Sequence, residues 1–294
     1  MTNGYRALRE TAARIDLAAR GKFRATGEDR ARLLHAMCTN DIEHLRPGQG
    51  CYAFFLNAQG RILADANILC FDDHLVIDTE PETRRKLFEH LERYIIADDV
   101  LLEDITEHLF TTAVEGPGAA QALARAGAPL PEAPYSWLKW GDRIVARIDS
   151  TGAGGFFIFH SGGLPLELDA ATPEEARIVR IENGRPRYGE EISERFLVQE
   201  TGQLRGVHFQ KGCYLGQEIV ERVRSQAKIH RLLRRLEIDT QEPPPPGAKT
   251  EQAEIMSAAF SPALGKVAAM AYVRVPFSDP GTQFPFGGAL AVVR

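Results

Sequence analysis

The chain has 294 residues, of which 44% are hydrophobic and 26% are charged, and its formal net charge is −5. These values are typical of a folded protein with about two or three domains, and they argue against long disordered spans. The negative balance also argues against a general polyanion-binding protein, so affinity for acidic ligands has to come from a local patch.

The first half of the chain predicts alternating helices and strands. Apolar residues at Tyr5, Leu8, Ala12, Ile15 and Ala19 have helical spacing and predict an amphipathic helix over residues 4–19. The further predicted elements are a strand over 22–27, a helix over 27–37, strands over 51–57, 61–70 and 74–79, a helix over 81–95, and strands over 100–105 and 109–116.

The second half of the chain again predicts alternating helices and strands, and after residue 230 it predicts strands alone. A helix is predicted over 116–127, a hairpin over 135–149, a strand over 154–161 and a helix over 172–183. After residue 230, short strands separated by proline and glycine predict a small closed or sandwiched β-domain. We therefore expect an α+β protein with helices on one face of antiparallel sheets, divided into residues 1–110, 111–228 and 229–294.

Four cysteines, Cys38, Cys51, Cys70 and Cys213, form no C-x-x-C pair and have no histidine at metal-site spacing, so no metal site is predicted. Such sparse cysteines favour a reducing compartment. The N-terminus has no signal-peptide core, and no apolar run reaches the ~20 residues of a membrane span. We expect a cytoplasmic protein that does not contact membranes.

Cys213 differs from the other cysteines, which lie in apolar patterns typical of a core. It follows Lys211 and Gly212 and precedes Gly216, where a helix is predicted to begin. A nearby cation and the positive end of a helix dipole both favour thiolate over thiol, which makes Cys213 a candidate reactive residue. The alternative is a small buried hydrophobic residue.

Two carboxylates are further candidates. Glu182 ends a predicted helix at Asn183-Gly184, and a carboxylate presented there could pair with the N–H donors of a pterin; the alternative is a solvated helix end. Asp65 lies between apolar strand residues, so it faces either solvent or a functional cleft.

A basic run follows the cysteine segment, without an intervening acid: Arg222, Arg224, Lys228, Arg231, Arg234 and Arg235. It could form a positive patch for carboxylates or phosphates, or a solvated face. No interleaved aromatic platform supports RNA binding, so direct nucleic-acid binding is not expected.

The octet "KGCYLGQE" (211–218), followed by Arg222, resembles the signature of the YgfZ family, folate-binding relatives of the glycine-cleavage T-protein. "RIENGRPRYGEEI" and "SPALGKVAAMAYV" are similar to further blocks of that group. The resemblance implies a ring of two α/β (ferredoxin-like) domains and a C-terminal β-barrel, with tetrahydrofolate or a one-carbon-substituted folate in the central opening. It also implies that Glu182 holds the pterin and that Asp65 lies where T-proteins carry a catalytic acid. The residues expected to bind the cofactor are completed by Lys211, Gly212, Tyr214, Gly216, Gln217, Glu218 and Arg222.

For function, the resemblance implies a tetrahydrofolate-binding factor that supports [4Fe–4S] cluster assembly or repair, with Cys213 engaging a cluster, iron or a partner thiol. Folate and iron–sulfur assembly proteins or client enzymes are the implied partners, and tRNA modification would be affected indirectly. The alternative is a folate-dependent aminomethyltransferase with Asp65 as acid and base. An RNA-modification accessory protein that uses the basic run is a third hypothesis.

Overall fold

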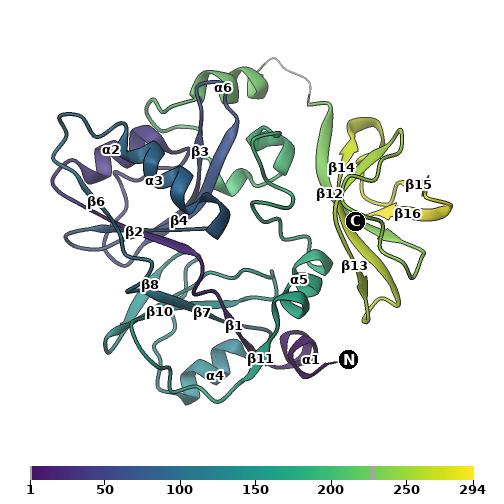
Figure 1. Cartoon of the computed structure of the whole chain (residues 1–294), viewed down its shortest axis with the longest axis horizontal. Helices are drawn as coiled ribbons and strands as arrows, with labels where there is room; N and C mark the ends of the chain where they lie inside the picture. The colour runs from purple at the N-terminus through teal and green to yellow at the C-terminus, as the bar shows by residue number, and fades with distance from the viewer. Residues whose placement is uncertain (1, 226–228) are drawn as a thin grey trace.

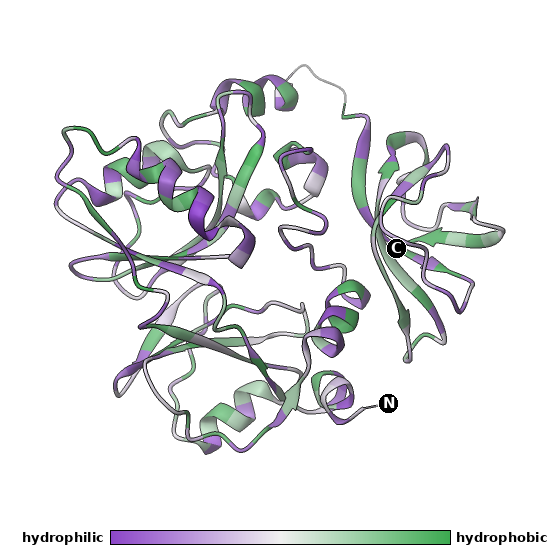
Figure 2. Ribbon diagram, in the orientation of Figure 1, coloured by the Kyte–Doolittle hydropathy of each residue, from purple (hydrophilic) through white to green (hydrophobic). Residues whose placement is uncertain are grey.

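The computed structural model describes residues 2–225 and 229–294. Its strands form three β-sheets that lie around a common centre (Figure 1). In Figure 2 the strands carry hydrophobic residues interspersed with hydrophilic ones. The fold is mixed α/β, as the sequence predicts.

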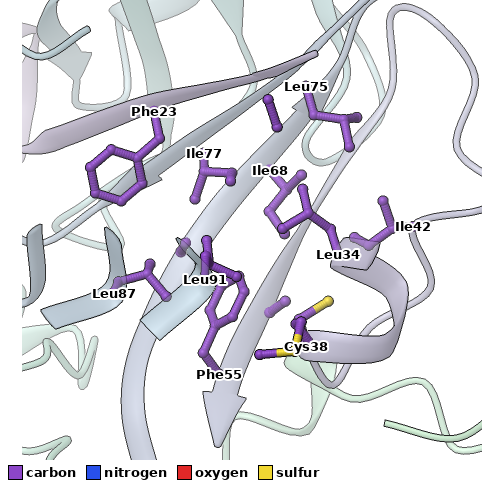
Figure 3. Packing of buried hydrophobic residues seen from close by; sticks show 14 of the residues in the cluster. Phe23, Leu34, Cys38, Ile42, Phe55, Ile68, Leu75, Ile77, Leu87 and Leu91 are labelled. Atoms are coloured by element: carbon purple, nitrogen blue, oxygen red, sulfur yellow. The ribbon is translucent and has the colours of Figure 1, made fainter. Parts of the chain in front are cut away.

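The first sheet has five antiparallel strands in the order β3-β4-β5-β2-β6. The strands are β2 (Gly21–Thr26), β3 (Gly50–Leu56), β4 (Ile62–Cys70), β5 (Leu75–Thr79) and β6 (Leu101–Asp104). Two helices, α2 (Arg30–Met37) and α3 (Arg84–Glu92), cover one face of this sheet. The short helix η1 (Pro81–Thr83) directly precedes α3. Figure 3 shows the core between these helices and the sheet, with Phe23, Leu34, Phe55, Ile77 and Leu87. The strands and helices predicted for this region are confirmed.

The opposite face of the first sheet is also covered, which explains why β3 and β4 are apolar almost throughout. Tyr52, Phe54 and Leu56 pack there against Tyr188 and Tyr214 of the connection that follows residue 182. This connection contains η2 (Val198–Thr201), η3 (Leu204–Gly206) and α6 (Gln217–Ser225). The octet therefore belongs to a segment that packs on the first sheet.

The second sheet has the order β11-β1-β7-β10-β9-β8. Its strands are β1 (Ala13–Asp16), β7 (Phe110–Glu115), β8 (Trp137–Trp140), β9 (Arg143–Ala146), β10 (Gly155–His160) and β11 (Asp169–Ala171). β1 pairs in parallel with β11, and the other pairs are antiparallel.

Helices cover both faces of this second sheet, so the expectation of helices on one face is wrong here. α1 (Asn3–Glu10) and α5 (Pro173–Glu182) pack on the face that contains Phe157. α4 (Ala119–Arg125) packs on the other face, against Phe156 and Ile158. Successive strand residues point to opposite faces, and here both sets are apolar.

The N-terminal helix is shorter than the predicted helix over residues 4–19. It ends at Glu10, and residues 13–16 form β1, in which Ala13 and Ile15 are buried while Arg14 and Asp16 are exposed. Of the apolar residues that suggested a continued helix, Ile15 lies in β1 and fits this alternation, whereas Ala12 precedes the strand and Ala19 is exposed after it. Pairing with β7 and β11, which are distant in sequence, supplies the backbone hydrogen bonds that decide in favour of the strand.

The third sheet has five antiparallel strands in the order β13-β14-β12-β16-β15. Its strands are β12 (Arg231–Ile238), β13 (Ala253–Ser261), β14 (Lys266–Arg274), β15 (Gln283–Phe286) and β16 (Ala289–Val293), with η4 (Val275–Phe277) after β14. The described strands form an open sheet with β13 and β15 at its edges, so the predicted barrel is not confirmed. The domain boundaries at 110 and 228 stay predictions, and the pairing of β1 with β7 shows that residues before 110 contribute to the second sheet.

The start of α5 offers a test of the fold, because Thr172 and Glu175 form a capping box there. The Thr172 hydroxyl accepts a hydrogen bond from the Glu175 amide (3.2 Å), and the Glu175 carboxylate accepts one from the Thr172 amide (2.7 Å). We expect Thr172→Ala to lower the free energy of unfolding by about 1 kcal/mol, since an orphan amide loses its partner. Urea denaturation measures this loss, and Thr172→Ser, which keeps the hydroxyl, is the control. Equal stability of the alanine and serine variants would contradict the role of the cap.

Candidate functional site

A cavity of about 440 Å³ lies between the first two sheets, with α5 forming part of its wall. Its lining includes Asp65 and Asn67 from β4, Ile15 from β1, Phe157 from β10 and Arg180 from α5. Elements far apart in sequence thus meet at this point. The mixture of apolar surface and a few polar groups is typical of small-molecule sites, which span roughly 300–1,000 Å³.

Asp65 is a buried carboxylate in the wall of this cavity, so the cleft alternative of the sequence analysis holds and the solvent alternative does not. Its Oδ2 accepts a hydrogen bond from the Tyr52 hydroxyl (2.7 Å), and Oδ1 has no protein partner within the described parts of the chain. Burial, assisted by the charge of Glu80, raises the pKa of Asp65 to about 6, although the Tyr52 hydrogen bond opposes the shift. A carboxyl group that titrates near neutral pH is suited to acid–base chemistry.

Glu80, a second carboxylate near Asp65 in this wall, is paired with arginines. The Arg20 guanidinium contacts Asp78 (2.8 Å) and Glu80, and Arg187 also contacts Glu80 (3.1 Å). Burial opposes the ionisation of Glu80, but Arg20 and Arg187 outweigh it and lower its pKa. Glu80 is therefore a charged neighbour of Asp65, whereas Asp65 itself has no arginine partner among the ion pairs of the described residues.

The α5 side of the cavity has a similar arrangement. Arg177 Nε donates to Glu190 (2.8 Å), and Arg180 contacts both Glu190 (3.0 Å) and the fully buried Glu191 (2.7 Å). Because these pairs are held by α5 and by the turn after it, they fix the shape of this wall.

Glu182 lies at the last residue of α5 but does not line the cavity. Its Oε1 accepts from the Tyr5 hydroxyl (2.6 Å) and from Ser261, and its Oε2 accepts from Arg9 (3.0 Å). Burial and the neighbouring Glu182 raise the pKa of Tyr5 to about 12. In this structure the carboxylate joins α1 and α5 to β13, and its role in holding a pterin stays a prediction.

The octet lies apart from the cavity, because none of its residues is among the described lining residues. Lys211 donates from Nζ to the carbonyl oxygens of His35, Cys38 (2.8 Å) and Asn40 (2.8 Å), at the C-terminal end of α2. Burial lowers the pKa of Lys211. The lysine therefore satisfies the orphan carbonyls of a helix end and attaches the octet to α2.

Residues 212–216 of the octet form a tight turn before α6, and Gln217 and Glu218 are the first residues of that helix. Tyr214 is buried, and its amide donates to the Gln217 side chain (3.3 Å). Gly216 has φ +83°, and a Cβ there would approach the Asn57 carbonyl oxygen to 2.7 Å, so the close contact with β3 requires glycine. Gly212 and Glu218 are exposed.

Cys213 is exposed, whereas Cys38, Cys51 and Cys70 are buried as predicted. The alternative that Cys213 is a buried hydrophobic residue is therefore wrong. The structure places its thiol on the octet turn ahead of α6 and not in the cavity lining, and its chemical role stays a prediction.

The predicted basic run is divided between two elements. Arg222 is exposed on α6, and Arg224 contacts Glu221 (3.4 Å). On β12, Arg231 contacts Glu200 (2.8 Å) and Arg235 donates to the Glu182 carbonyl (2.7 Å). Arg234 donates to the carbonyl of Ser278 (2.8 Å), and Lys228 lies outside the described residues. The arginines of β12 thus serve contacts within the protein.

The sequence analysis did not single out Tyr52, Glu80, Asn67 or Arg205 of the cavity wall. One signal was available: β3 and β4 form a hairpin in which Tyr52 is opposite Asn67, so Tyr52 and Asp65 share a face. The arginine pairs gave no such signal, because they join segments that are distant in sequence.

A charged cavity between the first two sheets, with one buried carboxylate that has no arginine partner among the described residues, defines an α/β protein with a small-molecule site. The sequence profile of the GCVT N-terminal domain matches residues 1–211, and the chain belongs to this GcvT-like, folate-binding family. The YgfZ branch suggested by the octet is the finer assignment and stays a prediction.

Known relatives and a solved structure agree with the family. The chain is 30% identical to a chloroplast protein named as a transferase, At1g60990 of Arabidopsis thaliana, over 71% of this chain but only 52% of that protein's length. It is 26% identical to an aminomethyltransferase of Chloroherpeton thalassium, over 93% of this chain and 82% of that protein. The crystal structure of the glycine cleavage system aminomethyltransferase T from Bartonella henselae is similar in fold, with a TM-score of 0.84, 21% identity, and coverage of 99% of this chain and 86% of that one.

None of the helices described here combines the length and the apolar character needed to cross a lipid bilayer. The expected cytoplasmic location stays a prediction.

The raised pKa of Asp65 predicts a pH dependence of stability. The folded state binds a proton between about pH 4 and pH 6 that the unfolded state releases, so the free energy of unfolding falls as the pH rises through this window. We expect Asp65→Asn to remove this fall, which amounts to about 2–3 kcal/mol between pH 4 and pH 7. Chemical denaturation at both pH values measures the difference, and the exposed Asp72→Asn is the control. If Asp65→Asn and Asp72→Asn changed the pH dependence equally, the carboxyl of Asp65 would not titrate as described.

Proposed function

We propose that this protein binds tetrahydrofolate in the central cavity and catalyses a folate-dependent transfer of the aminomethyl type, with Asp65 as the acid and base. The single observation that carries the proposal is the position of Asp65: buried, bound by Tyr52 on one oxygen, and without a protein partner on the other. The names of the bacterial relatives support the same type of reaction.

The chemistry of the cavity fits a reduced folate. A pterin ring presents several N–H donors on one edge and a flat apolar face. The cavity offers carboxylate oxygens, among them those of Glu80 and Glu190, together with apolar surface from Phe157, Pro173 and Pro186. Arginines in the same wall complement the carboxylates of a folate tail. Bound tetrahydrofolate supplies the nitrogen atoms that accept a one-carbon unit.

Asp65 has two features of a proton donor. Burial keeps a fraction of its carboxyl groups protonated at neutral pH, and the Tyr52 hydrogen bond fixes the orientation of the group. Its Oδ1 can then deliver a proton to the amine of the group that is moved and can recover it afterwards. Tyr52 is a positioning residue in this scheme, since it acts through Asp65.

Asp65→Asn tests the transfer reaction. With tetrahydrofolate and an aminomethylated lipoyl carrier protein, we expect wild type to form methylene-tetrahydrofolate and ammonia. We expect the variant to lose about 10²- to 10⁴-fold in kcat, because it lacks the proton donor, while tetrahydrofolate binding changes little. For wild type, kcat/KM should fall as the pH rises above about 6, since the protonated carboxyl is the active form. Binding is measured by calorimetry, with Asp72→Asn as the control.

Wild type that binds tetrahydrofolate but shows no turnover would contradict the transferase proposal and leave folate binding intact. Wild type that does not bind tetrahydrofolate would contradict both.

The second candidate function is support of [4Fe–4S] cluster assembly or repair, and the exposed thiol of Cys213 favours it. The octet turn is fixed to the end of α2 by Lys211 and to β3 by the close approach of Gly216, and it presents this thiol to solvent. We propose that a cluster, iron or a partner thiol would be engaged there as cargo, with iron–sulfur assembly proteins or client enzymes as partners. The described residues hold no group of three or more His, Cys, Asp or Glu side chains placed for a metal, so Cys213 would act together with ligands from the partner.

Cys213→Ser tests this second function. In a strain that lacks the gene, we expect wild type, but not the variant, to restore the activity of [4Fe–4S] enzymes, because serine does not supply a thiolate. Tetrahydrofolate binding by the purified variant should equal that of wild type, since Cys213 does not line the cavity. Full restoration by the serine variant would show that the thiol has no such role.

A further inference from the structure

Arg205 occupies an unusual position at the central cavity. It belongs to η3, lines the cavity and is exposed. Its guanidinium carbon lies 5.1 Å from the centre of the Tyr52 ring, and its Nε donates to the hydroxyl of Tyr135 (3.1 Å). Tyr52 in turn binds Asp65. Arg205 is thus held next to the tyrosine that orients Asp65, at a place in the cavity wall that is exposed to solvent.

The five other arginines of the cavity wall are all paired with carboxylates: Arg20 with Asp78, Arg177 with Glu190, Arg180 with Glu191, Arg185 with Asp149 and Arg187 with Glu82. Within the described parts of the chain, Arg205 forms no ion pair. Its Nη1 and Nη2 donors are therefore free to bind an anion, and a planar fork of two donors matches a carboxylate.

Tyr135, which holds Arg205, has a strained backbone. Its φ of +62° makes it the one non-glycine residue in the described ranges with a left-handed conformation. Such a conformation is costly for a bulky residue and persists where the surroundings fix it. Here the Tyr135 amide donates to the Arg147 carbonyl (3.0 Å), so the segment before β8 is attached to the end of β9. The strain positions a hydroxyl that reaches Arg205, seventy residues further along the chain.

We infer that Arg205, positioned by Tyr135 and Tyr52, binds a carboxylate of the ligand in the central cavity and selects ligands that carry one. The inference rests on the proposed function, under which this carboxylate belongs to the glutamate part of tetrahydrofolate. The ligand then extends from Asp65 at its reactive end to Arg205 at its acidic end. Arg205 is a specificity-determining residue in this arrangement, and Tyr135 is a positioning residue.

The test compares two ligands that differ only at the acidic end: tetrahydrofolate and tetrahydropteroate, which lacks the glutamate. Calorimetric Kd values are measured for wild type, Arg205→Gln and Arg85→Gln. Arg85 is an exposed arginine of α3 outside the cavity lining and serves as the matched control. We expect wild type and Arg85→Gln to prefer tetrahydrofolate by about tenfold, and Arg205→Gln to bind the two ligands equally, since a charge-assisted hydrogen bond is lost.

Tyr135→Phe separates positioning from folding. It should reduce the preference for tetrahydrofolate in the wild-type background, leave tetrahydropteroate binding unchanged, and have no effect in the Arg205→Gln background. If Tyr135 had only a structural role, Tyr135→Phe would weaken the binding of tetrahydrofolate and of tetrahydropteroate to the same extent.

The outcomes distinguish the inference from the proposed function. If wild type binds tetrahydrofolate and Arg205→Gln keeps the wild-type preference, the inference is overturned while the folate site stands. If wild type binds neither ligand, the proposed function fails, and this inference fails with it.

Discussion

Buried carboxylates that are satisfied from distant parts of the chain hold the third sheet against α5 of the second. Glu182 receives hydrogen bonds from Tyr5, Arg9 and Ser261, and Glu191 is paired with Arg180 and bound by Ser257. Removing one partner of such a buried pair costs about 3–5 kcal/mol, because the other charge stays in the interior. The second and third sheets therefore cannot separate at α5 without exposing these groups, and the cavity wall keeps its shape.

Most arginines of the cavity wall form ion pairs with carboxylates of the protein. Asp65 and Arg205 form no ion pair among the described residues. Asp65 has one unpaired oxygen and a raised pKa, and Arg205 has a guanidinium without a carboxylate partner among the described residues. Both adjoin Tyr52, from opposite ends of the side chain: the hydroxyl contacts Asp65 and the ring contacts Arg205. A single tyrosine thus links a site suited to proton transfer with a site suited to an anion, and this pairing underlies the proposed folate-dependent chemistry.

The sequence predicted the hairpins and helices well where the signal is local, as in the contiguous apolar runs of β3 and β4 and the capping residues of α5. It failed at residues 11–19, where pairing with distant strands decides the structure. Asp65 was singled out and lies in the cavity, but Glu182 turned out to face away from it. On a helix, two residues correspond to a rotation of about 200°, so Glu182 lies nearly opposite Arg180, which lines the wall. The separation of the octet from the cavity depends on how the connection after α5 packs, which no local pattern encodes.

The parallel pairing of β1 with β11 has a consequence for the order of events during synthesis. Ala13 is bonded in register with Asp169, and the entire first sheet is inserted in the chain between β1 and β7. A nascent polypeptide can therefore complete the first sheet early, while the segment around Ala13 has to wait for the ribosome to release its partner strand. Closing so long a loop carries an entropic cost that grows only slowly with loop length. The pairing of β1 with β11 is therefore late because β11 is made late, and not because the loop between them is especially costly to close. β1 is therefore made before the whole first sheet, but its pairing is complete only after β11 has been made.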